Sequence, residues 1–487
     1  MSRFGDSPAL TRVDSSRWLL SPSSLLVRLA PSLAALAALA LVAIYVVIST
    51  PDAIVQDTWL ALTSGREIVQ HGLPHVDHLT ILGAGRHWID QQWLGQLILY
   101  GLAAAGGMTA VAVAGMTAAL CAWAIALAAA SRAGTPSPTL ITLLTVAGLA
   151  SGPWALQIRT QELALPLFAL VLALLLRDPT LERRRTFLVL PLLVLWANVH
   201  GSVVLGVAVA VAYAVTICLA SRPRVSALRR AWPYLLLPPA ALLASPYGLS
   251  LVHYYRVMLI DPPFRHLVDE WQATLPGRHT AIFFALAAFT ALVAVRSIRR
   301  FQPAELVVLA LTFSLALAAA RNIVWFALAV LAVVPARVGK PHHGFHTRAA
   351  GSAAVVMGAV VLAVLISALA KPPSYFQGRM GPAAAAAVGR SLEQTGGPVF
   401  ADDTHADWLL WTFPVARGRI VYDDRLEILT RPQVKLLAAT LSGSDPSLLR
   451  RSSLFVLDPA RARQVERLRP SRVVYADAAS AVLVGSG

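Results

Sequence analysis

Two aspartates in one long polar loop, residues 50–92, have the side chains and positions best suited to acid–base chemistry. Asp57 follows the first apolar segment and begins a helix-like amphipathic stretch over 60–70, so its carboxylate is expected near the surface of a bilayer. A carboxylate placed there can act as a general base, but the position also suits an N-cap that satisfies the first turn of a helix. Asp77 follows Pro74 and is either a second catalytic carboxylate or a turn residue. Spacing alone leaves both pairs of alternatives open.

Four more polar clusters interrupt the apolar segments of the chain. They are Arg159-Thr160-Gln161-Glu162, Asn198-Val199-His200-Gly201-Ser202, the 246–279 loop with Tyr247, Glu270 and Trp271, and Arg321-Asn322. Polar residues at membrane depth cost free energy and mostly line a cavity or a pathway. Structural alternatives exist for three of them: His200 can bond a carbonyl at a helix end, Arg321 can extend to lipid headgroups, and Glu270 can belong to an interfacial helix.

The composition excludes a soluble enzyme. The chain has 487 residues, of which 57% are hydrophobic and only 14% are charged, whereas soluble domains carry about 25% charged residues. The net charge of +16 comes almost wholly from arginine, and we attribute it to cytoplasmic loops and anionic lipids rather than to nucleic acid. The two cysteines lie inside apolar runs and provide no disulfide framework.

The elements that must position the polar clusters are apolar segments of membrane-spanning length, which is about 20 residues. Candidates are 31–49, 108–130, 138–156, 160–177, 184–198, 201–220, 231–245, 280–296, 303–319, 323–337 and 350–370. We expect 31–49 to be a retained span rather than a signal peptide, and 93–105 to be too short to cross. This count gives about eleven spans, and it is the count that places all the arginine-rich stretches on the cytoplasmic side of the membrane. All five polar regions then fall on the extracytoplasmic face and are expected to form one site.

After residue 371 the pattern changes. Strand-like runs over 397–401, 419–422, 453–457, 471–475 and 481–484 alternate with helix-like runs over 406–411, 431–440 and 461–468. The sequence thus predicts an all-α polytopic membrane protein with a small C-terminal α/β extracytoplasmic domain. Its parts are a cytoplasmic segment 1–30, a transmembrane domain 31–370 and the domain 371–487. The aspartates at 402–403 and 423–424 are interpreted as solvated turns, and Trp59, Trp88 and Trp93 as an interfacial aromatic belt.

The order of these motifs resembles that of the GT-C superfamily of integral-membrane glycosyltransferases, and more closely that of a bacterial subgroup of GT-C-like proteins. The matching residues are Asp57/Trp59, His71-Gly72/Pro74/Asp77, Trp88/Trp93-Leu94, Arg159/Gln161, Trp196/Asn198/His200-Gly201, Pro246-Tyr247-Gly248, Glu270-Trp271, Arg321-Asn322/Phe326 and Asp424-Arg425. Two departures are Thr160, where a proline is common, and Gln92, near which an acidic residue is often found.

The resemblance implies transfer of a hexose or pentose from a polyprenyl-phosphate-linked donor to an extracytoplasmic glycan, lipid or protein. It implies Asp57 as the general base, with Asp77 as second choice or as a metal or acceptor ligand. The residues expected at the lipid phosphate are Arg159, Gln161, Asn198, His200, Arg321 and Asn322. Those expected at the acceptor or sugar are His75, Tyr247, Glu270 and Trp271.

The resemblance also implies the plasma membrane as location and the lipid-linked donor and membrane lipids as partners. No metal ligands are assigned. Some related transferases use a divalent ion, so the resemblance leaves a divalent metal ion open as a cofactor. Two other functions stay open as well. One is a transporter or flippase of lipid-linked material, and the other is a non-catalytic membrane assembly protein, which the Gln92 departure would suit.

Overall fold

The computed structural model describes residues 53–131, 137–152, 157–260, 262–338, 370–377 and 380–486, together with Leu362 and Ile366. The cytoplasmic segment predicted over 1–30 and the span predicted over 31–49 lie outside the described residues. So does nearly all of the span predicted over 350–370. The total of about eleven spans therefore stays a prediction.

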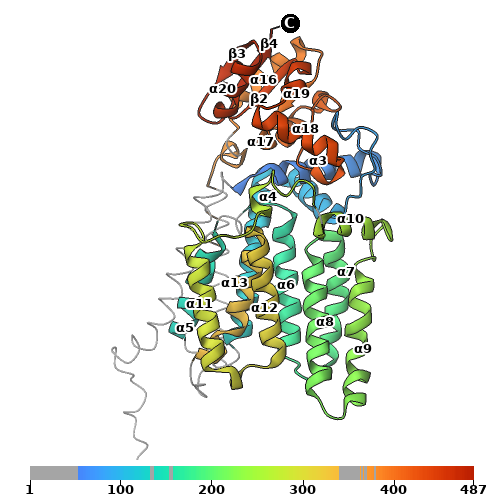
Figure 1. Ribbon diagram of the computed structural model, residues 1–487, viewed down its shortest axis with the longest axis vertical. Helices are drawn as coiled ribbons and strands as arrows, with labels where there is room; N and C mark the ends of the chain where they lie inside the picture. Colours follow the sequence, from blue (N-terminus) through green and yellow to red (C-terminus); the bar gives the residue numbers. More distant parts are fainter. Residues whose placement is uncertain are drawn as a thin grey trace, which may run out of the picture.

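The helical domain is a bundle of long apolar helices that lie side by side (Figure 1). Its members are α4 (Trp93–Ser131), α5 (Ser137–Ser151), α6 (Thr160–Leu176), α7 (Val189–Val199), α8 (Val203–Ala220), α9 (Arg224–Ala241), α11 (Ala281–Arg296), α12 (Pro303–Ala318) and α13 (Ile323–Val333). Among the described residues, α4 and α8 meet the length and hydropathy expected of a membrane-crossing helix, and five apolar helices are shorter.

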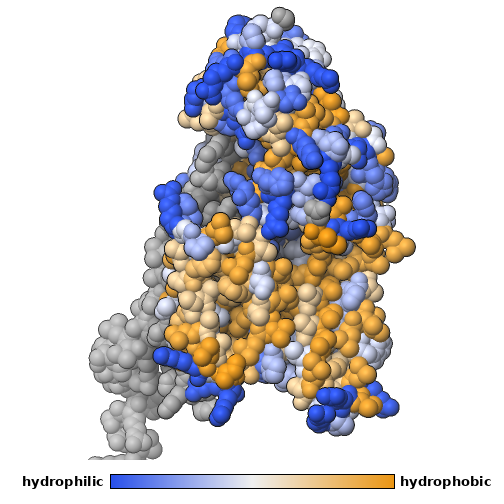
Figure 2. All heavy atoms as spheres, viewed as in Figure 1, coloured by the Kyte–Doolittle hydropathy of each residue, from blue (hydrophilic) through white to orange (hydrophobic). Residues whose placement is uncertain are grey.

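The surface of this domain is apolar where a soluble protein would be polar. Figure 2 shows a broad hydrophobic band over the helices. Large apolar side chains of these helices are exposed, such as Leu219, Leu236, Leu292 and Val295. Exposed apolar surface on this scale is favourable only against lipid. The molecule is therefore a polytopic membrane protein, as its composition predicts.

The two ends of the bundle differ in charge. The turn between α8 and α9, the 3-10 helix η3 (Arg184–Leu188) and η5 (Ile298–Arg300) carry arginines at the end far from the C-terminal domain. The polar clusters gather at the opposite end, because α6 begins and α7 and α12 end there. Charge thus separates along the bundle as the positive-inside rule leads us to expect.

The segment predicted not to cross is set apart from the rest of α4 by a glycine kink. Gly106 and Gly107 have non-helical backbone angles, and Gly107 has φ +65°, which favours glycine. Before the kink, Trp93 Nε1 donates to Asn198 Oδ1 over 2.8 Å at the end of α7. Tyr100 packs edge-on against Trp411 of the C-terminal domain. The first part of α4 therefore runs among the elements that join the two domains.

Helix α3 (Gln56–His71) forms the link between the bundle and the C-terminal domain. It packs against α17 (Asp403–Thr412), where Arg66 donates to the backbone oxygens of Leu410 and Trp411 over 2.6 and 2.9 Å. The N-cap of α3 is Val55, and Asp57 lies in the first turn. The N-cap alternative for Asp57 is therefore wrong, and its side chain is available for contacts outside its own helix.

The C-terminal domain is a four-stranded mixed sheet with helices, as predicted. Its elements are α16 (Pro382–Gln394), β1 (Val399–Ala401), α17, α18 (Arg431–Ser442), α19 (Ser447–Arg451), β2 (Leu454–Leu457), α20 (Pro459–Leu468), β3 (Ser471–Ala476) and β4 (Ala481–Gly485). The strand order is β1-β2-β4-β3, with β1 and β2 parallel and the other pairs antiparallel.

One predicted strand is missing from this sheet. Residues 419–422 form only isolated bridges, from Ile420 to Val399 of β1 and to Thr80 of the 50–92 loop. The backbone of Ile420 thereby ties the loop to the edge of the sheet, and the chain that follows is directed toward the bundle. This connection brings the residues after 422 to the polar end of the helices.

Candidate active site

Four charged residues from four separate segments form one ion-pair network. Arg159 Nη1 lies 2.8 Å from Asp57 Oδ2 and 3.0 Å from Glu270 Oε2, and Arg321 Nη1 lies 3.0 Å from Glu270 Oε1. The two positive and two negative charges balance. The structure thus brings together Asp57, Arg159, Glu270 and Arg321, which come from α3, the start of α6, η4 (Asp269–Trp271) and η6 (Ala320–Asn322).

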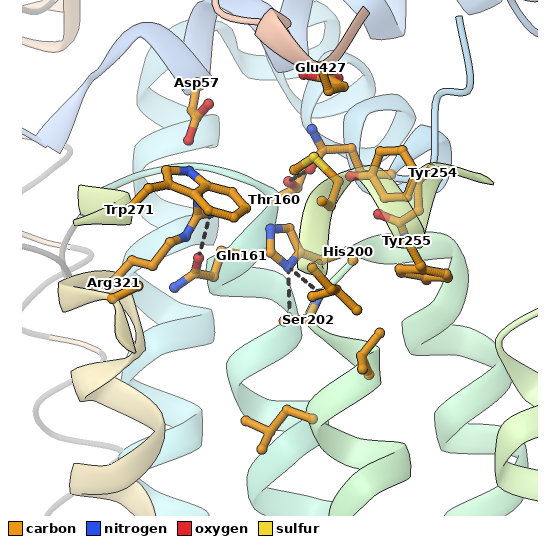
Figure 3. Close-up of a pocket in the computed structure, with 18 of the residues that line it drawn as sticks. Asp57, Thr160, Gln161, His200, Ser202, Tyr254, Tyr255, Trp271, Arg321 and Glu427 are labelled. Atoms are coloured by element: carbon orange, nitrogen blue, oxygen red, sulfur yellow. Dashed lines mark hydrogen bonds between the residues drawn. The ribbon is translucent and has the colours of Figure 1, made fainter. Parts of the chain in front are cut away.

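Helix ends hold both arginines in place. The backbone N–H of Arg159, at the N-cap of α6, donates to the Glu162 carboxylate over 2.9 Å. Arg321 Nη2 donates to Gln161 Oε1 over 3.2 Å, and its guanidinium stacks on the Trp271 ring at 4.9 Å (Figure 3). The cation–π contact and the hydrogen bond show that Arg321 is fixed by the protein and does not extend to lipid headgroups.

Arg159 is almost fully buried behind this network, with 3% of its side chain exposed. Among the described residues, its Nε and Nη2 atoms have no hydrogen-bond partner. Buried donors without a partner cost about 1–3 kcal/mol each. Arg159 therefore retains hydrogen-bonding capacity beyond its contacts with Asp57 and Glu270.

The network shifts the pKa values of two neighbouring carboxyl groups in opposite directions. Burial raises the pKa of Asp57, but the charges of Arg159 and Arg321 and a hydrogen bond with Asp424 outweigh it and bring the pKa to about 2. Burial and the charge of Asp57 raise the pKa of Asp424 well above its usual range. Asp57 is thus ionised at neutral pH, whereas the Asp424 carboxyl beside it keeps its proton to a higher pH than an ordinary aspartate.

A cavity of about 330 Å³ opens in front of these groups. Its polar end is lined by Asp57, Thr160, Gln161, His200, Glu270, Trp271, Arg321 and Asn322. It continues into the bundle along Leu205 and Ala208 of α8 and Leu311 and Leu315 of α12. The site therefore combines a charged head with an apolar passage between two helices.

The C-terminal domain contributes to the same cavity through Asp424, Arg425 and Glu427. Arg425 Nη2 lies 2.7 Å from Asp77 Oδ1 and 2.5 Å from Asp423 Oδ2, and its guanidinium stacks on the Trp88 ring at 4.1 Å. Asp402 is also buried, where it caps α17. The interpretation as solvated turns is therefore wrong for Asp402 and Asp423, which are buried, and for Asp424, which lines the cavity, whereas Asp403 is exposed as that interpretation expects.

The aromatic-belt interpretation is wrong for two of its three tryptophans. Trp59 and Trp88 are buried inside the protein. Trp88 is the ring on which Arg425 stacks, and Trp59 lies in the core that α3 shares with its neighbours. Their burial follows from the C-terminal domain folding back over the loop, which hydropathy alone does not indicate.

Asp77 lies away from the cavity. It is completely buried, and its oxygens accept hydrogen bonds from Leu79 N, Thr80 Oγ1 and Arg425 Nη2. Burial raises the pKa of Asp77, but the charge of Arg425 and these hydrogen bonds lower it by more, so the pKa lies below its usual value. The contacts of Asp77 hold the 50–92 loop on the C-terminal domain, and they occupy both of its carboxylate oxygens.

Three more residues that were predicted to contact a ligand instead contact other loops of the protein. Asn198 Nδ2 donates to Ala244 O over 2.7 Å, and its Oδ1 accepts from Trp93. Tyr247 donates its hydroxyl to Pro74 O over 2.8 Å, and the His75 ring packs edge-on against Tyr247. Asn198, His75 and Tyr247 therefore lie outside the cavity lining, whereas His200 lines it and bonds Ser202 (Figure 3).

The sequence reasoning missed several lining residues. Thr160 Oγ1 donates to Gln92 Oε1 over 2.6 Å, so the two departures from the family motif contact each other. Tyr254, Tyr255 and Glu427 also line the cavity. Glu427 follows the Asp424-Arg425 motif by two residues, a signal that could have been used.

No group of three or more histidine, cysteine, aspartate or glutamate side chains within the described part of the chain is arranged to hold a metal ion. The pair considered for a divalent ion, Asp57 with Asp77, is not assembled, because Asp77 is bound to Arg425. The binding of a divalent metal ion therefore stays a prediction.

Comparison with known proteins bears on the fold. No protein-family model and no curated protein matches this chain. Among solved structures, ArnT from Cupriavidus metallidurans bound to undecaprenyl phosphate is similar, with 14% sequence identity and a TM-score of 0.48, over 92% of this chain and 97% of ArnT. The apo state of the same protein matches with 14% identity and a TM-score of 0.49, over 91% of this chain and 96% of ArnT. The Archaeoglobus fulgidus oligosaccharyltransferase in its apo form matches with 11% identity and a TM-score of 0.50, over 93% of this chain and 74% of that one. The last likeness shows that the chain has the GT-C membrane fold predicted from its motifs.

Proposed function

We propose that this protein is a membrane glycosyltransferase that takes its sugar from a polyprenyl-phosphate-linked donor. The observation that carries the proposal is the cavity, in which Arg321 stands at the head of an apolar passage between α8 and α12, with Arg159 joined to it through Glu270. A ligand that fits both parts is amphiphilic, with an anionic group at the arginines and a hydrocarbon chain between the helices.

The arginines recognise the donor phosphate. Arg321 lines the cavity and makes the first contact, while Arg159 is reached when the Glu270 carboxylate moves aside. The Nη1 atom that Glu270 leaves and the unpartnered Nη2 atom beside it then gain an acceptor. Arginine suits this exchange because its planar group pairs bidentately with phosphate as well as with carboxylate.

Asp57 is the general base. The acceptor oxygen attacks the anomeric carbon, the bond from that carbon to the phosphate oxygen breaks with its electron pair, and the acceptor proton passes to Asp57. A single displacement of this kind inverts the anomeric centre. The polyprenyl phosphate gains a negative charge as it leaves, which Arg321 and Arg159 stabilise.

The low pKa of Asp57 belongs to the donor-free state. Both arginines are then available to stabilise its charge and that of Glu270. A phosphate that shares the arginines weakens this stabilisation and raises the pKa of Asp57, which makes the carboxylate a stronger base. Donor binding thus prepares the group that the next step needs.

A transfer assay in membranes tests this proposal. Membranes that contain the wild-type protein, Asp57→Asn or Asp269→Asn are supplied with a panel of polyprenyl phosphates that carry radiolabelled hexoses or pentoses. Asp269 is the matched control, because it is an exposed carboxylate next to Glu270. We expect the wild type and the control to transfer label from one donor, and Asp57→Asn to lose at least about 100-fold. Transfer at the wild-type rate by Asp57→Asn would remove Asp57 from this role.

A further inference from the structure

A second cavity, of about 280 Å³, adjoins the first. Three residues line both: Ile89, Tyr254 and Glu427. Figure 3 shows Tyr254 and Glu427 on the side of the main cavity away from Arg321 and Asp57. The two cavities therefore meet at a common wall across the main cavity from Asp57 and Arg321.

The second cavity is built from different elements than the first. It is lined by the 50–92 loop, by α10 (Ser250–Leu259) with the chain after it, and by residues 427–431 of the C-terminal domain. No residue of α8 or α12 within the described structure lines it. It therefore lies at the polar end of the bundle and is not a second passage for a hydrocarbon chain.

Basic side chains dominate the polar lining of this second cavity. They are Arg86, His87, His253 and Arg431, and Glu427 at the common wall is the one carboxylate among its lining residues in the described chain. Arg86 Nε donates to Ile428 O over 2.6 Å, which holds its guanidinium at the cavity. Helix α18 begins at Arg431, so the positive end of its dipole adds to the same potential.

The charges along the wall of the second cavity would orient a bound anionic ligand. An anionic group is attracted to Arg86 and Arg431 and repelled by Glu427 when that side chain is ionised. A ligand held in this way keeps its anionic end at the basic side and presents its remaining part to the common wall. A hydroxyl at that wall is the group that reaches the main cavity.

On the basis of the proposed function, we infer that the second cavity binds the acceptor, and that this acceptor carries a phosphate or carboxylate group in addition to the hydroxyl that is glycosylated. The donor enters along the helices and the acceptor from the basic side. The two substrates thus approach the reaction centre through separate cavities and meet at Tyr254 and Glu427.

The charge of the product tests the acceptor class. Membranes from cells that naturally contain the protein are incubated with the labelled donor panel, and the product is applied to an anion-exchange resin. We expect the labelled product, freed of donor, to be retained and to elute with salt. A product that passes through as a neutral molecule would overturn the inference. Extraction with chloroform and methanol then distinguishes the sources, since a lipid headgroup acceptor partitions into the organic phase and a soluble anion does not.

Two sets of variants test the place of binding. The double variant Arg86→Gln/Arg431→Gln removes both arginines, and His253→Glu adds a negative charge at an exposed position without removing a described contact. The matched controls are Arg256→Gln/Arg278→Gln and His266→Glu, which are exposed and line neither cavity. We expect about tenfold slower transfer at limiting acceptor in both cavity variants and no change in the controls.

Binding of undecaprenyl phosphate to the purified full-length proteins separates this inference from the proposed function. We expect all of these variants to bind it as the wild type does. Normal transfer by His253→Glu and by the double arginine variant would overturn the acceptor cavity while leaving the proposed function intact. Failure of the wild type to bind undecaprenyl phosphate would contradict the proposed function and this inference with it.

Discussion

Arg159 Nη1 donates to Asp57 Oδ2 over 2.8 Å, although one residue begins α6 and the other lies in the first turn of α3. The same nitrogen contacts Glu270. A single buried guanidinium thus fixes the orientation of the proposed base and of the carboxylate that stands where a phosphate is expected.

Removing the cavity-facing arginine should weaken donor binding. We expect Arg321→Gln to raise the Kd for undecaprenyl phosphate about tenfold, because a charge-assisted hydrogen bond to the phosphate is lost. Binding is measured with the purified protein in nanodiscs, with Arg278→Gln as the control for an exposed arginine. An unchanged Kd would mean that the phosphate binds elsewhere.

Removing the competing carboxylate should have the opposite effect. Glu270 bridges Arg159 and Arg321, and a phosphate has to displace it. We therefore expect Glu270→Gln to lower the Kd for undecaprenyl phosphate severalfold in the same assay. Weaker binding by this variant would show that Glu270 assists the phosphate rather than competing with it, and Asp269→Asn is again the control.

The stability of the protein should depend on pH through Glu427. Burial is the main cause that raises its pKa from 4.5 to about 7. The folded protein then keeps a proton that the unfolded chain releases, so stability is highest below the unfolded pKa and falls as the pH rises toward 7. We expect Glu427→Gln to raise the melting temperature at pH 8 by a few degrees more than at pH 5, as followed by fluorimetry. The exposed Glu393→Gln should show no such difference.

Asp77 should be needed for the docking of the loop rather than for chemistry. Asp77→Asn removes one of the two carboxylates that hold the buried Arg425, and breaking a buried pair is costly. We expect a melting temperature several degrees lower than the wild type, with undecaprenyl phosphate binding and residual transfer retained in the folded fraction. Complete loss of transfer by a protein of normal stability would return Asp77 to a catalytic role.

The sequence predicts the bundle and the tail well because their signals are local. Apolar length marks α6, α8 and α12, and short apolar runs mark β2 and β4. Counting the membrane-spanning segments is enough to place Arg159, Glu270 and Arg321 at the same end of the bundle. The basic turns lie at one end, so the remaining polar clusters must lie at the other. These predictions need no knowledge of which helices touch.

What the sequence does not indicate is the return of the C-terminal domain onto the site. Asp423 and Asp424 look like solvated turns until Trp88 and Asp77 are seen to bury Arg425 between them. Asn198 and Tyr247 show the reverse case. Their motifs suggest ligand contacts, whereas their polar atoms bond to neighbouring loops. Only long-range packing separates a residue that faces a cavity from one that supports its wall.

A structure of the full-length protein with undecaprenyl phosphate tests the central claim most directly. We predict that the phosphate lies within hydrogen-bonding distance of Arg321 and Arg159, that the Glu270 carboxylate has moved away from at least one of them, and that the polyprenyl chain runs between α8 and α12. A phosphate bound away from both arginines, with the Asp57–Arg159–Glu270 contacts unchanged, would contradict the account.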